Sequence, residues 1–332
     1  MSKSPWLPVL ISLVFLFAIN ILMVSSLAPN LVKKQLIAWI IGLILFFIGR
    51  QINPKQISSS KRLIFFTSCA LLLLPIVLNS ITRGSCRWID LGFVSIQPSE
   101  IVKPWLLLFL SNTKFPLLHL IPVGIIALQP DLGSALSVLF LMAPIIIYNP
   151  KFLKISLVIT TIFLVISPMI YNFALHDYQK ERIVTFLNPA SDPLDKGYNV
   201  IQSKIAIGSG GFLGKGYKKG TQGQLLFLPE KHTDFMFAAT AEELGFVGIF
   251  IILTAYYFLI KTLLDKAFLV RNNRVLFLFT LGITLQIWMQ VFVNIGMNIG
   301  ILPITGIPLP FLSVGGSSIL TLLFSIGIIY SS

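Results

Sequence analysis

Stretches of up to about twenty mostly apolar residues recur along the whole chain, separated by short polar segments. A helix needs about that length to cross the hydrocarbon core of a bilayer. Polar and apolar positions within the stretches do not alternate as they do in barrel strands. The pattern therefore predicts an all-α polytopic membrane protein with about ten transmembrane helices. The expected spans are 6–26, 34–50, 63–80, 98–112, 116–129, 132–149, 152–175, 236–261, 275–297 and 310–330.

One long polar stretch, at about 176–235, interrupts this pattern between the seventh and eighth spans. It holds six of the twelve acidic residues of the chain, and the last of them, Asp234, directly precedes the next apolar run. Neither an inserted soluble domain nor an internal repeat is visible. We therefore expect a single integral-membrane domain over residues 1–332, carrying one long loop.

Composition and charge agree with a membrane protein. Hydrophobic residues make up 55% of the chain and charged residues only 11%, whereas soluble domains carry about 25% charged residues. The net charge of +13 does not indicate nucleic-acid binding, because the basic residues gather in the loops. Twelve Lys and Arg lie in one set of loops and four in the short loops opposite. The positive-inside rule then places both termini in the cytoplasm and the long loop outside.

The N-terminal apolar run is too long for a signal peptide, so we expect an uncleaved first helix. Cys69 falls in a span and Cys86 in a loop. Two cysteines at different depths predict neither a disulfide nor a metal site.

Two charges fall inside the fourth span. Glu100 and Lys103 are three residues apart, on one face of a helix that begins at Pro98. Charges within a span are costly and usually face a partner or a wet cavity. The pair is thus either a structural ion pair or a direct contact for the substrate.

Two further polar groups stand at outer helix ends. Asp131 follows a Gln-Pro pair at the head of the sixth span. It either caps that helix or serves as a polar contact or metal-proximal carboxylate in the same outer cavity as Asp234. Ser317 lies in the sequence Phe-Leu-Ser-Val-Gly-Gly-Ser-Ser at 311–318. The small residues there permit either close helix packing or a helix end that accommodates phosphate.

Common catalytic motifs do not account for the polar stretch. Gly208–Gly216 lacks the first Gly and the final Ser or Thr of a phosphate-binding P-loop, and we interpret it as a flexible or re-entrant surface loop. His232 and Asp234 have no accompanying nucleophile elbow, and the chain has only three His. Asp234 could equally cap the next helix. Of the carboxylates two turns further on, Glu242 and Glu243, one should face a partner or a cavity.

Five segments resemble the SEDS family of bacterial cell-wall polymerases, the RodA/FtsW/SpoVE group. They lie at 90–103, 129–136, 180–217, 228–246 and 302–318. The residues at 180–217 and 305–311 favour the member of the family that acts in cell elongation. Cys86, Val314 and Pro104 depart from the usual family pattern. None of these departures removes a carboxylate. Cys86 stands where the family often has a basic residue, which puts substrate binding at this position in doubt.

The resemblance implies a peptidoglycan glycosyltransferase that polymerises lipid II and works with a class B penicillin-binding protein in the cytoplasmic membrane. It implies that Asp234 is essential, with Glu100, Lys103 and Asp131 in support. We expect Asp234 to act as general base at the periplasmic rim, since diphosphate leaves without a protonating acid. Arg87, Lys215, Lys218 and Lys219 are candidates to hold that diphosphate, with or without a divalent ion such as Mg²⁺ or Mn²⁺.

Two other functions fit the same residues. A flippase for lipid-linked precursors would also show intramembrane charges and interrupted spans, although it would usually show repeated halves. A non-catalytic scaffold for a penicillin-binding protein would tolerate loss of Asp234. Without the resemblance, the residues indicate only a ten-helix membrane protein with an outward-facing polar site.

Overall fold

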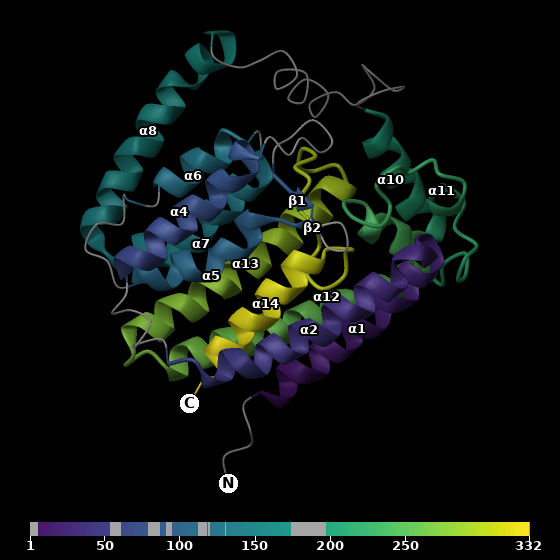
Figure 1. The fold of residues 1–332 in the computed structure, drawn as a ribbon. Helices are drawn as coiled ribbons and strands as arrows, with labels where there is room; N and C mark the ends of the chain where they lie inside the picture. Colours follow the sequence, from purple (N-terminus) through teal and green to yellow (C-terminus); the bar gives the residue numbers. More distant parts are fainter. Residues whose placement is uncertain are drawn as a thin grey trace. The chain divides into compact units, whose positions relative to one another are not determined.

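The computed structural model describes residues 6–53, 61–78, 87–90, 95–111, 118, 120–129, 131–173 and 197–331. These residues are mostly helical (Figure 1). The helices before the long loop are α1 (Leu7–Leu27), η1 (Pro29–Leu31), α2 (Val32–Gln51), α4 (Lys61–Val77), α5 (Pro98–Ser111), α6 (Leu120–Ala127), α7 (Leu132–Tyr148) and α8 (Pro150–Phe173). Those after it are α10 (Tyr198–Gly210), α11 (Thr221–Gln224), α12 (Met236–Leu269), α13 (Arg274–Asn298) and α14 (Gly316–Ile329).

Every range predicted as a span overlaps one of these helices. Four stretches in the described part of the chain are long and apolar enough to cross a membrane, namely 7–27, 29–51, 236–269 and 274–298. Large apolar side chains remain exposed on them, among them Ile40, Ile44 and Phe47 of α2. The prediction of a helical polytopic membrane protein is confirmed, whereas the number of crossings stays a prediction.

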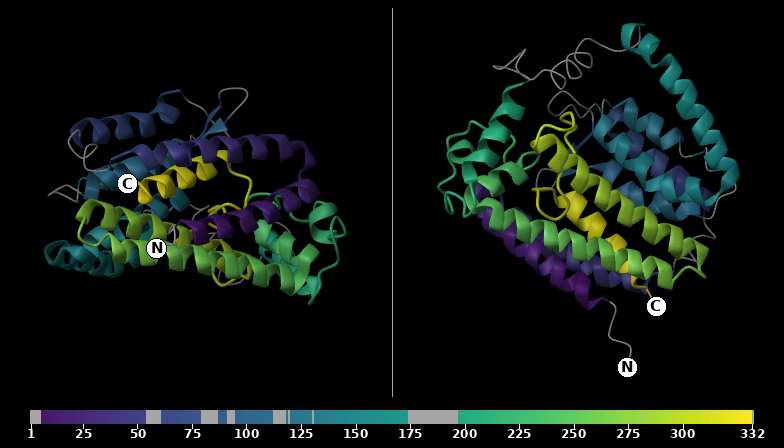
Figure 2. Two further views of the ribbon diagram at one scale, coloured as in Figure 1. Left: turned by 90° about the horizontal axis from the view of Figure 1, so that it is seen from below. Right: turned by 180° about the vertical axis from the view of Figure 1, so that it is seen from behind.

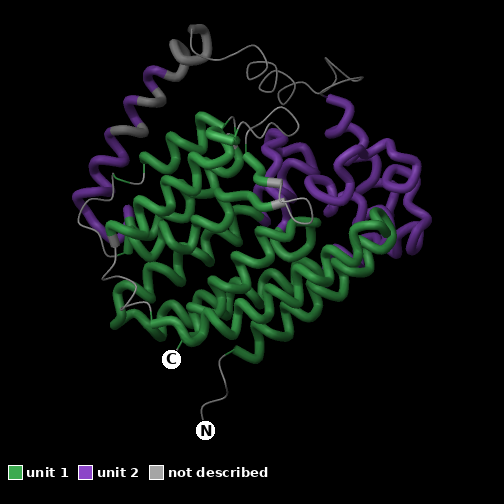
Figure 3. The backbone as a smooth tube through the Cα atoms, in the orientation of Figure 1, with its two compact units in different colours: residues 1–145, 252–290, 310–332 green, residues 146–251, 291–309 purple. Residues whose placement is uncertain are grey.

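The chain divides into two compact units (Figure 3). The first comprises residues 1–145, 252–290 and 310–332, and the second comprises 146–251 and 291–309.

In the first unit, α2 lies along α14 (Figures 1 and 2). Glycines allow this close approach: a Cβ added at Gly49 would meet the carbonyl oxygen of Phe324 at 2.6 Å, and one at Gly327 would collide with that of Phe46. Small residues at such contacts let two helix backbones pack without side chains between them. The packing fixes α14, which carries Ser317 in its first turn.

The segment before α14 is held by buried side chains of the N-terminal helices. Asn20 Nδ2 donates to the carbonyl oxygen of Leu312 (2.6 Å), while Asn20 Oδ1 accepts from Gln35 Nε2 (3.1 Å) and Trp39 Nε1 (3.0 Å). Irregular backbone away from water needs such partners. The Pro- and Gly-rich approach to α14 therefore has a defined path.

The described part of the long loop, residues 197–235, contains α10 and α11. The interpretation of Gly208–Gly216 as a flexible or re-entrant loop was wrong for Gly208–Gly210, which form the last turn of α10. A Cβ at Gly210 would collide with the carbonyl oxygen of Ala241 in α12. Gly210 thus serves helix packing, a use that short-range sequence patterns do not distinguish from loop flexibility.

Candidate functional site

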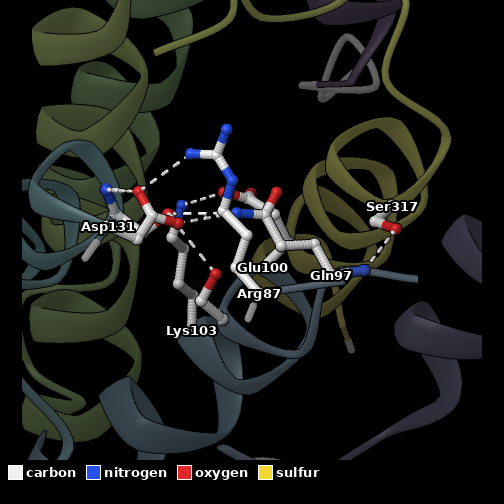
Figure 4. Close-up of polar contacts among 8 residues, drawn as sticks. Arg87, Gln97, Glu100, Lys103, Asp131 and Ser317 are labelled. Carbon is white, nitrogen blue, oxygen red and sulfur yellow. Dashed lines mark hydrogen bonds and ion pairs between the residues drawn. The ribbon is translucent and has the colours of Figure 1, made fainter. Parts of the chain in front are cut away.

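Glu100 and Lys103 form an ion pair at the start of α5, with Lys103 Nζ 2.5 Å from Glu100 Oε1 (Figure 4). Both side chains are buried, with exposed fractions of 5% and 1%. The predicted ion pair is confirmed. Glu100 Oε2 has no hydrogen-bond partner among the described residues, so the pair is incompletely satisfied for a buried charge.

The predicted helix cap by Asp131 is confirmed, whereas its place in an outer cavity with Asp234 stays a prediction. Asp131 Oδ1 accepts from the backbone N–H of Ser134 (3.1 Å), which caps α7, and Asp131 Oδ2 accepts from the Ser134 hydroxyl (2.8 Å). The same carboxylate lies 3.5 Å from Arg87 Nη1. Asp131 is buried, whereas Arg87 keeps 30% of its side chain exposed. The cap fixes the carboxylate, and the carboxylate in turn orients a partly exposed guanidinium.

Gln97 links these groups to α14 and was missed at the level of sequence. Its Nε2 donates to Asp131 Oδ2 (3.1 Å), and its backbone N–H donates to Ser317 Oγ (3.1 Å). Figure 4 shows Gln97 between Asp131 and Ser317. The available signals were its position just before the helix-starting Pro98 and its place in the family-like segment 90–103.

Two short strands bring the segments that carry Arg87 and Gln97 close together. Strands β1 (Ile89–Asp90) and β2 (Ser95–Ile96) pair antiparallel, with Ile89 opposite Ile96. Residues just before the first strand therefore lie beside residues just after the second. By this register Trp88 falls opposite Gln97, with Arg87 next to it, and both Arg87 and Gln97 contact Asp131. Cys86, the departure from the family pattern, lies outside the described residues.

Asp234 belongs to the second unit and directly precedes Phe235 and the start of α12. Its side chain is half-buried, and its carbonyl oxygen accepts from Asn294 Nδ2 (3.1 Å) and Asn298 Nδ2 (3.0 Å). A Cβ added at Gly306, where φ is 70°, would lie 3.7 Å from Asp234 Oδ2. The backbone of Asp234 is thus held by α13, and its carboxylate lies close to the backbone of the loop before α14.

Two carboxylates in the second turn of α12 hold the segment 215–224. Glu242, fully buried, accepts from Lys215 Nζ (2.6 Å) and Thr221 Oγ1 (2.9 Å) and from two backbone N–H groups. Glu243 accepts from the backbone N–H of Lys218 (3.1 Å). The expectation that one of these carboxylates faces a partner is confirmed for both.

The basic residues of this segment differ in their surroundings. Lys215 is paired with Glu242, whereas Lys218 is exposed with its Nζ 5.4 Å from the centre of the Tyr217 ring, and Lys219 is exposed. Lys231 is buried, and its Nζ donates to the carbonyl oxygen of Gly223 (2.5 Å). Burial lowers the pKa of Lys231, while the nearby Glu243 raises it.

The predicted site residues thus fall into two groups. Arg87, Glu100, Lys103, Asp131 and Ser317 belong to the first unit, and Lys215, Lys218, His232 and Asp234 to the second. His232 is half-buried, two residues before Asp234. Within the described ranges, no group of three or more His, Cys, Asp or Glu side chains is arranged to hold a metal ion. Dependence on a divalent cation stays a prediction.

A chain of apolar helices with paired carboxylates buried at their ends is an integral membrane protein with a polar functional site. The family described as "Cell cycle protein", the FtsW, RodA and SpoVE group, matches residues 6–332. The chain belongs to this family.

Individual relatives agree with that assignment. The peptidoglycan glycosyltransferase MrdB of Escherichia coli K12 is 38% identical over 97% of this chain and 91% of its own length. A chain in a structure titled for polymerization and crosslinking by a peptidoglycan synthase complex matches with a TM-score of 0.83 and 32% identity, covering 97% of this chain and 95% of that one. The rod shape determining protein RodA of Thermus thermophilus matches with a TM-score of 0.70 and 26% identity, covering 98% and 94%.

Proposed function

We propose that this chain is a peptidoglycan glycosyltransferase that polymerises lipid II into glycan strands during cell-wall elongation. The names of its relatives support the activity, and one observation supports the site. Asp234 is a half-buried carboxylate at the start of an apolar helix, and two amide side chains fix its carbonyl oxygen. A base must be held at a defined distance from its proton, and a held backbone provides that.

The proposed reaction joins two lipid-linked sugars. Asp234 accepts the proton of the acceptor hydroxyl, and the freed oxygen lone pair attacks the anomeric carbon of the donor. The bond between that carbon and the diphosphate oxygen breaks, and the polyprenyl diphosphate leaves with the bonding electrons. The leaving group is stable as an anion, so one carboxylate suffices where most glycosidases need two.

The departing diphosphate needs positive charge nearby. We assign this role to Lys218, which is exposed and belongs to the same unit as Asp234. A role for Arg87 stays a prediction. Lys215 contributes less, because Glu242 already neutralises it. Mg²⁺ commonly binds through substrate phosphates, and a divalent ion carried by the diphosphate would add to the same effect. Support of the reaction by Glu100, Lys103 and Ser317 stays a prediction from the sequence.

The proposed setting is the cytoplasmic membrane of a bacterium. Both termini lie in the cytoplasm, and the segment that carries Asp234 faces the periplasm, as the distribution of basic loop residues indicates. The proposed partner is a class B penicillin-binding protein, which would crosslink the strands that this chain makes. A similar chain in a peptidoglycan synthase complex supports that pairing.

The test is polymerisation of lipid II by the purified chain together with its transpeptidase partner. Asp234→Asn and Asp234→Ala should abolish glycan polymer while the protein stays folded. Asp265→Asn changes an exposed carboxylate of α12 and serves as the matched control, with activity expected to match the wild type. Normal polymer from either Asp234 variant would refute the assignment of the base.

Two further assays separate the rival functions. In liposomes, a flippase would move labelled precursor across the bilayer without forming polymer. In cells that carry only the Asp234→Asn variant, a scaffold would keep normal cell shape. We expect neither result.

A further inference from the structure

The segment 211–224 is attached to α12 by several backbone and side-chain hydrogen bonds. Backbone N–H groups of Lys215 and Gly216 donate to the carbonyl oxygens of Glu242 (2.9 Å) and Glu243 (3.0 Å). Gly214, with φ of 79°, and Gly245, with φ of 65°, allow the two backbones to touch, since L side chains rarely adopt these angles.

Glu242 also holds the first turn of α11. Its carboxylate accepts from the backbone N–H groups of Gln222 (3.0 Å) and Gly223 (3.2 Å) as well as from Lys215 and Thr221. A fully buried carboxylate is costly unless it is paired and hydrogen-bonded. Here every donor comes from the one segment, so Glu242 sets where Gly223 lies.

Gly223 in turn holds Lys231. Its carbonyl oxygen accepts from Lys231 Nζ at 2.5 Å, and the lysine is 7% exposed. Burying an ammonium group costs free energy. Lys231 lies three residues before Asp234, so this contact fixes the chain close to the proposed base. The chain of contacts runs from Glu242 through the backbone of Gly223 to Lys231.

The other side of Asp234 is held independently. Asn294 and Asn298 of α13 bind its carbonyl oxygen, and Phe235 is buried against Ala206, Leu228 and Ala238. The segment 231–235 is therefore fixed at both ends, by a charged contact before Asp234 and by amides and apolar packing at and after it.

We propose that Lys231 and Glu242, joined through the backbone of Gly223, are positioning residues that hold the Asp234 carboxylate in place for proton transfer. Neither needs to touch the substrate. The inference rests on the proposed role of Asp234 as the base. A displacement of about 1 Å at a reacting group can cost about a hundredfold in rate, so loosening this support should lower kcat.

The test is steady-state polymerisation by Lys231→Met in the full chain with its transpeptidase partner. Methionine keeps the apolar length of the side chain and removes the donor to Gly223. We expect kcat per folded enzyme to fall about 10- to 100-fold, with KM for lipid II within about twofold. Lys231→Arg keeps a charged donor and should recover most of the kcat. Lys154→Met, at an exposed lysine of the same unit, is the matched control.

A merely structural role predicts a different result. It would lower the folded fraction or the melting temperature and leave kcat per folded enzyme unchanged, which would overturn the proposal. A raised KM at normal kcat would also overturn it, because Lys231 would then bind substrate. Should Lys231→Met not fold, Thr221→Val removes the hydrogen bond that Thr221 Oγ1 donates to Glu242, together with the one it accepts from Lys215 Nζ. This variant should still lower kcat about threefold, as loss of such bonds allows, and an unchanged kcat would count against the idea.

Failure of this inference is distinguishable from failure of the proposed function. If Asp234→Asn abolishes polymer and Lys231→Met leaves kcat intact, only the positioning role is lost. If Asp234→Asn polymerises normally, the base itself is misassigned, and with it the role of Lys231.

Discussion

Asn298 ties Asp234 to α12 through a single side chain. Its Nδ2 donates to the carbonyl oxygen of Asp234 at 3.0 Å, and its Oδ1 accepts from the backbone N–H of Ala238 at 3.2 Å. Asn298 is itself fully buried, and its carbonyl oxygen accepts from Ser203 of α10 at 2.8 Å. One amide thus holds the residue before the helix and a first-turn N–H of the helix in a fixed relation.

Asn298→Leu should therefore reduce both stability and activity. Leucine matches the volume but leaves the N–H of Ala238 and one bond to the Asp234 carbonyl unmade, which costs about 1–3 kcal/mol for each buried group left unsatisfied. Thermal unfolding in detergent and polymer yield measure the two effects. Asn272→Leu, at an exposed asparagine between α12 and α13, is the control and should change neither. Equal behaviour of the two variants would show that the Asn298 contacts are dispensable.

Glu100→Ala should lower the stability by about 3–5 kcal/mol, because it leaves the Lys103 ammonium buried without its partner. The double variant Glu100→Gln with Lys103→Met removes both charges and should regain most of that stability. If the pair also serves the reaction, polymerisation stays low in the double variant. Melting temperatures and lipid II turnover, measured on the same preparations, separate the two roles. An unchanged melting temperature for Glu100→Ala would argue against the buried ion pair.

Asp131 can be tested by separating its cap from its charge. Asn is as good a helix N-cap as Asp, so Asp131→Asn should keep the bond to the Ser134 N–H and lose the attraction to Arg87. Asp131→Ala loses both and should cost a further 0.5–2 kcal/mol or so. We expect both variants to be impaired in polymerisation and only Asp131→Ala to lose the cap energy. Full activity in Asp131→Asn would mean that the cap is all that matters.

Two glycines of α10 form a matched pair for the packing of the loop on α12. Gly210→Ala places a methyl group against the carbonyl oxygen of Ala241 and should destabilise the protein by about 1–3 kcal/mol. Gly208→Ala meets nothing within 4 Å and should be neutral or stabilising by up to about 1 kcal/mol. Differential scanning of the two purified variants checks the order. A reversed order would contradict the described contact between α10 and α12.

The sequence predicted the helices well because apolar length is a local property. Each expected span overlaps a helix, and the start of α5 at Pro98 agrees with the prediction, although α12 extends beyond the expected end at 261 to Leu269 and α14 begins at Gly316 instead of 310. The same local reasoning found the Glu100–Lys103 pair, since residues three apart share a helix face. It failed at Gly208–Gly210, where a helical end and a loop have the same composition.

Residues far apart in the chain were out of reach of local patterns. Gln97 lies in the family-like segment 90–103, but it carries no charge that would mark it as a site residue, and it joins Asp131 to Ser317. Asn294 looked like an ordinary polar residue of a span and Asn298 like the first residue of the following loop, and they bind the carbonyl oxygen of Asp234. Their importance comes from contacts across more than thirty residues of sequence, which periodicity does not encode.

The sequence by itself determined the membrane class, the approximate spans and the candidate carboxylates, because burial in lipid imposes length and composition on each segment separately. Only the tertiary structure decided which carboxylates accept hydrogen bonds that hold other segments of the chain. Glu242 caps and anchors a loop, Asp131 does so for α7 while also orienting Arg87, and Asp234 keeps its side chain half-buried. That division follows from which donors the fold brings to each carboxylate, and those donors come from segments that meet only when the chain is folded.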